Sequence, residues 1–156
     1  MATESPLLHD GSQCVVNFDA RNSSVTGTTL AGPNGSAQFL AVMLGTTADR
    51  TITQTSSGSS GQLAYGILQN KPSTGIAADV GIFGITKAVA HTTFAAGSEV
   101  MTSGSSMTGR LTLFTTTIGA NRLGRTLESV TTVGQVFTMA LYGFGMGGGA
   151  IVSSTA

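Results

Sequence analysis

The chain has 156 residues, which is enough for one domain with its own hydrophobic core and too few for two self-supporting ones. Charged residues make up only 9% of the chain, seven acids balance seven bases, and 40% of the residues are hydrophobic. The neutral balance excludes a basic nucleic-acid-binding domain, and the hydrophobic content excludes a largely disordered chain.

Residues 1–35 are polar and rich in turn-forming residues, so they are predicted to form an extended N-terminal arm. Two apolar islands interrupt the arm, namely Pro6-Leu7-Leu8 and Val15-Val16-Asn17-Phe18. Glu4 and Asp10 precede the first basic residue, Arg21, and a signal peptide would carry the opposite charge at this place.

Residues 36–142 read as one core domain made of short strands. Runs with β-branched residues or apolar alternation are separated by turns rich in Gly, Ser and Thr, at a spacing typical of a small barrel or sandwich. The predicted strands cover residues 39–44, 51–55, 63–68, 79–89, 99–101, 111–115, 122–128 and 135–142. No apolar pattern of 3.6-residue period persists for three turns, so helix is expected to be scarce and the fold class to be all-β.

The longest predicted strand covers residues 79–89. Val80 and Ile82 alternate on one face, while Phe83 and Ile85 alternate on the other. Because both faces are apolar in this part, the strand is predicted to be buried on both sides, with Phe83 and Ile85 in the core.

Residues 143–156 form a Gly-rich C-terminal tail, and its start matches the dinucleotide-binding string G-x-G-x-x-G. A pyrophosphate site also needs a following helix and an acid about 20 residues later, and the remaining residues provide neither. The match therefore predicts no nucleotide site. The longest apolar run, residues 39–44, is far below the roughly 20 residues of a membrane-spanning helix.

Few residues could carry chemistry. The histidines are His9 and His91, and the single Cys14 can form neither an internal disulfide nor a cysteine-based zinc site. These residues are interpreted as scattered polar positions, so no catalytic residue, metal or cofactor is expected. The chain is predicted not to be an enzyme, and an enzyme domain is the least favoured alternative.

The order of strands and turns from Ala64 to Tyr142 resembles a known family. The stretches that carry the resemblance are Tyr65–Pro72, Val80–Val89, Ala95–Val100, Gly109-Arg110, Leu123–Glu128 and Val136–Leu141. They resemble the capsid decoration, or cement, proteins of tailed bacteriophages. The resemblance implies a β-barrel or β-tulip-like core that forms a homotrimer and binds the major capsid protein on the outside of the expanded head. It also implies a virion location after synthesis in the host cytoplasm. The balanced charge and the short apolar runs leave neither nucleic acid nor membrane as an expected partner.

The capsid contact is assigned from the sequence to the arm, over residues 4–20. Its candidate capsid-binding residues are Pro6, Leu7, Leu8, Val15, Val16 and Phe18. The second island has strand propensity and could add to an exposed sheet edge of a capsid subunit. The alternative is that the arm packs against its own barrel or a neighbouring copy. A rival function is a ligand-binding or adhesin-type β-barrel on a virion or cell surface, although such a pocket needs aromatic residues and the chain has no Trp.

Overall fold

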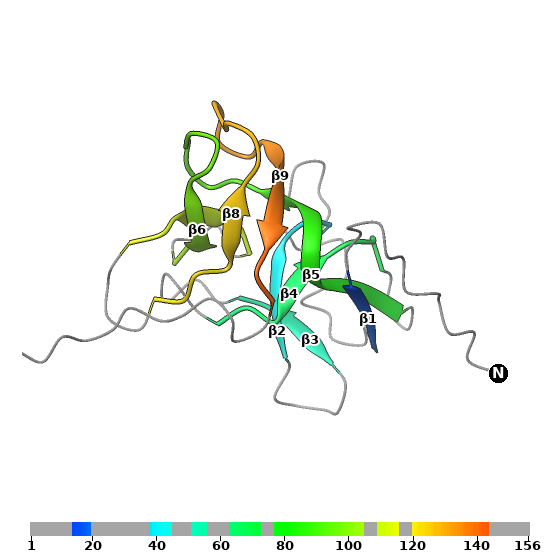
Figure 1. Ribbon diagram of the computed structural model, residues 1–156. Coiled ribbons are helices and arrows are strands. Elements are labelled where there is room, and N and C mark those ends of the chain that lie inside the picture. The colour runs from blue at the N-terminus through cyan, green and yellow to red at the C-terminus, as the bar shows by residue number, and fades with distance from the viewer. Residues whose placement is uncertain are drawn as a thin grey trace, which may run out of the picture.

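A computed structural model describes residues 14–19, 38–44, 51–55, 63–72, 77–104, 109–115 and 120–143. These residues contain nine strands and no helix, which confirms the all-β prediction (Figure 1). The strands are β1 (Cys14–Asp19), β2 (Ala41–Leu44), β3 (Ile52–Gln54), β4 (Gly66–Leu68), β5 (Ala77–Val89), β6 (Glu99–Thr102), β7 (Leu111–Leu113), β8 (Gly124–Thr126) and β9 (Val136–Leu141). Strands β2 to β9 each overlap a stretch for which the sequence predicts a strand, and β5 begins two residues before its predicted stretch.

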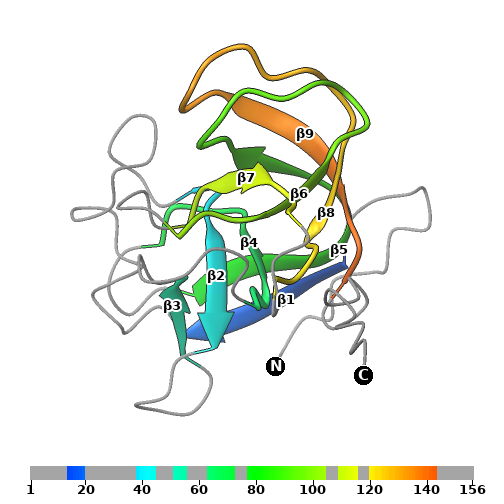
Figure 2. The ribbon, with the colours of Figure 1, turned by 90° about the vertical axis from the view of Figure 1, so that its left-hand side faces the viewer.

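The strands form one antiparallel sheet that curls into a half-barrel. Their order is β3-β2-β4-β5-β9-β8-β6-β7, and β1 is added to β5. Figure 2 shows the sheet bending so that β6 and β7 come round toward β2. The backbone N–H of Ala41 donates to the carbonyl of Gly109 at 2.7 Å, and the N–H of His91 donates to Leu111 at 2.6 Å. These bonds attach the segment around the start of β7 to distant parts of the sheet, so the curl is held by backbone pairing as well as by the core.

Strand β5 connects the two halves of the sheet and has 13 residues. Val80 and Gly81 pair with both β4 and β1, so these two strands lie on opposite edges of β5. From Gly84 onward β5 pairs with β9, which the strand order places on the edge away from β4. Strands β1 and β9 therefore follow one another along the same edge of β5. The change of partner falls at Gly84, whose φ of 99° is a conformation that glycine adopts without steric strain.

The half of the sheet made by β5, β9, β8 and β6 turns one face to the core. Paired residues of neighbouring strands share a face, so each inward-facing row can be followed across the strands. The inward-facing rows are Gly84-Leu141-Gly124-Val100, then Thr86-Met139-Thr126, then Ala88-Phe137. A Cβ at Gly124 would overlap the carbonyl oxygen of Ala140 and the side chain of Met139. Glycine at this position is what allows β8 to lie so close to β9.

Buried apolar side chains form two clusters. The first includes Phe94, Val100, Leu111, Phe137 and Met139, and the second includes Leu40, Val42, Ile52, Leu68, Val80 and Val89. The rings of Phe94 and Phe137 meet edge to face, with centroids 5.0 Å apart and an interplanar angle of 77°. This geometry is favourable for aromatic pairs, and it fixes the loop that carries Phe94 onto β9.

The prediction that Phe83 and Ile85 are core residues is wrong. Their exposed fractions are 57% and 52%, whereas Val80, Thr86 and Ala88 are buried. Alternation correctly separates the two faces of β5. The error concerns Phe83 and Ile85 on the second face, which no described element covers, although Val89 further along that face is fully buried in the second cluster.

Strand β1 pairs with β5 of the same chain, with Val16 opposite Val80 and Phe18 opposite Ala78. The backbone of Val15, Val16 and Phe18 is therefore part of this protein's own sheet, which matches the alternative in which the arm packs against its own barrel. Pro6, Leu7, Leu8 and His9 lie outside the described residues, as does the tail beyond Gly143.

Candidate protein-binding surface

The solvent-facing side of β5, β9, β8 and β6 is the most unusual surface of the described chain. Ile85 pairs with Ala140, Ala140 with Arg125, and Arg125 with Glu99, which forms one row across four strands. These strands lie side by side in Figure 1. We call this surface the outer face. It comprises Phe83, Ile85 and Lys87 of β5, Thr138 and Ala140 of β9, Arg125 of β8 with Leu127 just after it, and Glu99 of β6.

Large apolar side chains on the outer face are widely exposed. Phe83 is 57% exposed, Ile85 52% and Leu127 50%. Leu127 belongs to the same surface because its N–H donates to the carbonyl of Thr138, which pairs with Lys87. An antiparallel sheet with one solvated face normally carries polar residues there. Several large exposed apolar side chains in that position are instead typical of a surface that binds another protein segment.

Charged side chains border this apolar group, and cations prevail among them. The Nε of Arg122 lies 3.2 Å from Oε2 of Glu99, and Nη2 of Arg125 lies 3.7 Å from Oε1 of the same carboxylate. The Arg122 guanidinium also lies 4.7 Å from the centroid of the Phe114 ring. The Glu99 carboxylate thus forms ion pairs with two guanidinium groups. Exposed pairs of this kind add little stability, so we interpret them as a feature of the surface and not as a support of the fold.

Two further charges complete the border of the outer face. Lys87 is exposed on β5, and no acid of the described residues pairs with it. Glu128 directs its carboxylate to the backbone N–H of Thr138 and accepts a hydrogen bond there. With Lys87, Arg122 and Arg125 against Glu99 and Glu128, the outer face and its border together carry a net positive charge in a chain whose formal charge is zero.

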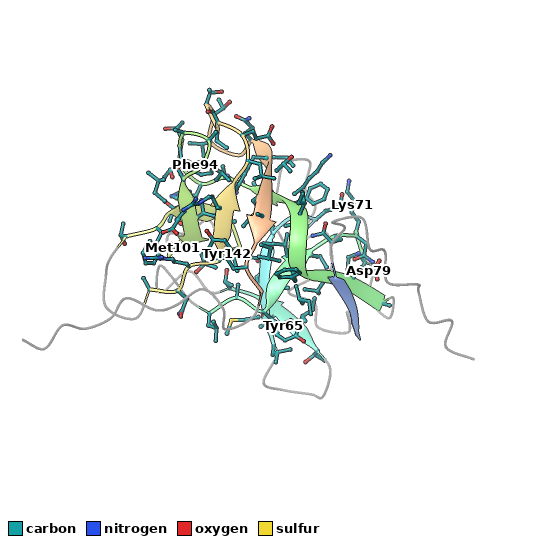
Figure 3. All side chains as sticks on the ribbon, viewed as in Figure 1. Tyr65, Lys71, Asp79, Phe94, Met101 and Tyr142 are labelled. Carbon is teal, nitrogen blue, oxygen red and sulfur yellow. The ribbon has the colours of Figure 1, made fainter. Side chains whose placement is uncertain are left out.

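The end of the molecule marked by Phe94 in Figure 3 is formed by two loops that are bonded to each other. The N–H of Phe94 donates to the carbonyl of Val130 at 3.1 Å, and the N–H of Val130 donates back at 2.8 Å. The N–H of Ala96 donates to Oγ of Ser129 at 3.1 Å. Val133 is 57% exposed in this region. These hydrogen bonds hold the two loops together beyond the end of the outer face.

Of the residues singled out from the sequence for possible chemistry, His9 lies outside the described residues, and His91 and Cys14 lie in different parts of the fold. Among the described residues, no group of three or more His, Cys, Asp or Glu side chains is placed to hold a metal ion. His91 is half-buried beside β7, and the backbone of Cys14 lies opposite Phe83, on another strand. Within the same part of the chain, no helix is long and apolar enough to cross a membrane. Sequence reasoning missed the outer face itself, although the apolar residues on both faces of residues 79–89 were its signal.

Comparison of the sequence with protein-family models and with curated proteins finds no match. Comparison of the structure finds the N base of the head fiber gp8.5 of bacteriophage phi29, with a TM-score of 0.50 and 15% sequence identity. The superposition covers 83% of this chain and 94% of the phage chain. At this identity the likeness establishes a shared fold, which extends over almost the whole of the phage domain.

Proposed function

We propose that this chain is a structural protein of a bacteriophage head, and that it binds the outer surface of the major capsid protein lattice as a decoration protein. The observation that carries the proposal is the outer face, a widely exposed apolar surface on a sheet whose other side forms the core. The shared fold with a head fiber base supports the same assignment, because that domain is part of a phage head. We further propose that the chain forms a homotrimer, that this trimer stabilises the expanded head, and that it catalyses no reaction.

The low charge of the chain suits this role. Charged residues are 9% of the sequence, so contacts with a shell rest mainly on apolar area and backbone groups. Phe83, Ile85 and Leu127 provide such area close together, and aromatic and large aliphatic residues in the centre of an interface carry most of its binding energy. The cations at the border favour a capsid surface that presents carboxylates around an apolar centre.

The test is co-sedimentation with purified expanded shells of the phage that encodes this chain. The double variant Phe83→Ser/Ile85→Ser is expected to bind at least about tenfold more weakly, because two central apolar anchors are lost. Leu44→Ser/Leu63→Ser is the matched control, since these leucines are 45% and 46% exposed and lie outside the outer face. The control is expected to bind within about twofold to threefold of the unmodified chain.

Each outcome decides a separate point. If the unmodified chain does not bind the shells, the proposed function is wrong. If both double variants bind like the unmodified chain, the outer face is not the contact and the arm residues Pro6, Leu7 and Leu8 become the remaining candidates. Tight binding of a small ligand by the free protein, with no affinity for shells, would favour the ligand-binding or adhesin-type module instead.

A further inference from the structure

The outer face lies beside the point where the first thirteen residues of the chain join the sheet. Strand β1 begins at Cys14, and Cys14 is the register partner of Phe83. Residues 1–13 are therefore attached to the sheet directly next to the most exposed phenylalanine of the outer face. Their composition is the counterpart of that surface, because they contain Pro6, Leu7 and Leu8 together with Glu4 and Asp10 and no Lys or Arg.

We propose that residues 1–13 of this chain bind to the outer face, with the apolar residues at 6–8 over Phe83 and Ile85 and the acids toward Lys87 and Arg125. Three observations support this occupant. The attachment point at Cys14 is adjacent to the surface. The outer face has a net positive charge, and the segment is acidic. The outer face exposes Phe83 and Ile85, and the segment contains Pro6, Leu7 and Leu8 to pack on them.

The length of the segment is sufficient. An extended chain covers about 3.3 Å per residue, so thirteen residues reach roughly 43 Å. The row from Ile85 to Glu99 spans three strand spacings, or about 14 Å. The whole outer face is within reach from Cys14. Because the segment is tethered, its effective concentration at the surface is on the order of millimolar, and weak contacts are enough to keep it bound.

Two other occupants fit less well. The C-terminal tail also starts nearby, since Leu141 pairs with Gly84, but residues 144–156 contain no acid to match the cations. A second copy that docked through its own outer face would bring the cations of two outer faces together, which repels. This inference rests on the proposed function in one respect only: if a capsid subunit uses the outer face, it has to displace residues 1–13, so the two compete for one surface.

The chain contains no tryptophan, so Phe83→Trp introduces a single fluorescent reporter into the outer face. In the full-length protein the reporter is expected to be protected from acrylamide. Adding Leu7→Ser/Leu8→Ser is expected to raise the quenching constant at least about twofold and to shift the emission to the red. Glu4→Lys/Asp10→Lys is expected to act in the same direction at low salt, because screening weakens charge pairing at higher ionic strength.

The matched control is Ile151→Ser/Val152→Ser, which removes two adjacent large apolar residues of the tail and is expected to leave the quenching constant unchanged. Leu127→Trp repeats the measurement at a second position, in case the Phe83→Trp substitution disturbs the sheet. Equal quenching with and without the arm substitutions at both positions would overturn the proposal. Protection that depends on residues 151 and 152 would assign the outer face to the tail instead. Protection that disappears on dilution, although the arm is intact, would assign it to a second copy of the chain.

The shell assay separates this proposal from the proposed function. A protected reporter in a protein that binds no shells leaves the arm contact standing and removes the capsid role. An unprotected reporter in a protein that binds shells through Phe83 and Ile85 rules out the arm contact and leaves the capsid role standing. If both hold, Leu7→Ser/Leu8→Ser is expected to strengthen shell binding several-fold, because a competitor for the outer face has been weakened.

Discussion

Phe137 and Phe83 belong to neighbouring strands of one sheet and point to opposite sides of it. Phe137 is 1% exposed and packs edge to face on Phe94, while Phe83 is 57% exposed on the outer face. The same side chain thus has two different roles, set by which side of the sheet meets the core. The free energy of unfolding depends on the first residue, and surface recognition depends on the second.

This difference gives a matched pair of substitutions. Phe137→Ala is expected to lower the free energy of unfolding by roughly 3–5 kcal/mol, because it leaves a cavity in the core. Phe83→Ala is expected to change it by less than about 1 kcal/mol, since surface substitutions rarely cost more. Urea unfolding of the two variants beside the unmodified chain measures both values. Similar losses for the two would show that the assigned sides of β5 are wrong.

At the scale of elements, β1 is the part of the arm region that belongs to the sheet. It pairs with β5 from Cys14 opposite Phe83 to Asp19 opposite Ala77, on the edge that β9 occupies further along. Its removal would leave the backbone groups of that half of β5 without their partners. A deletion that is meant to test the arm must therefore stop before residue 14.

Two deletions are expected to behave differently in a thermal unfolding experiment. Removing residues 1–13 should change the free energy of unfolding by less than about 1 kcal/mol, because the sheet stays intact. Removing residues 1–20 should cost roughly 2 kcal/mol or more, because several ladder hydrogen bonds of about 1 kcal/mol each are lost. For a chain of this size, the second value corresponds to a decrease in Tm of about 4–8 °C. Equal melting temperatures for the two truncated proteins would argue against the pairing of β1 with β5.

At the scale of the whole molecule, the dominant property is the small number of charges. Seven acids and seven bases are distributed over 156 residues, and several of the described ones gather around the outer face. Solubility of a free monomer usually relies on a surface with many more Lys and Glu residues. A surface of small neutral residues is better suited to permanent contact with other protein surfaces, including copies of the same chain.

The homotrimer that we propose is therefore expected to be visible in solution. Light scattering coupled to size exclusion should give three times the chain mass of 15.7 kDa at concentrations on the order of 10–100 μM. The mass should change little between low and high salt, because few charges take part in the contacts. A mass of one chain throughout this range, both free and after release from shells, would contradict the trimer.

The sequence by itself determined the strand positions and the separation of their two faces. Strand formation here is local: β-branched residues at 51–55 and alternation at 79–89 favour extended backbone, and Gly, Ser and Thr between the runs favour turns. For this reason β3 lies in the stretch predicted for it, and β5 covers its predicted stretch and begins two residues earlier. The apolar islands of the arm were also visible in the sequence, but the sequence did not determine which surface they contact.

Only the tertiary structure decided which apolar residues are covered. Alternation places Phe83 and Ile85 on one side of β5, but their exposure depends on whether another element lies over that side, and none of the described elements does. The partner of β1 was undecided for a similar reason, because edge pairing joins residues far apart in the sequence and any exposed edge offers the same backbone groups. The outer face exists because four strands from distant parts of the chain bring Ile85, Arg125 and Glu99 into one row. That juxtaposition is a property of the register between strands, which local sequence does not encode.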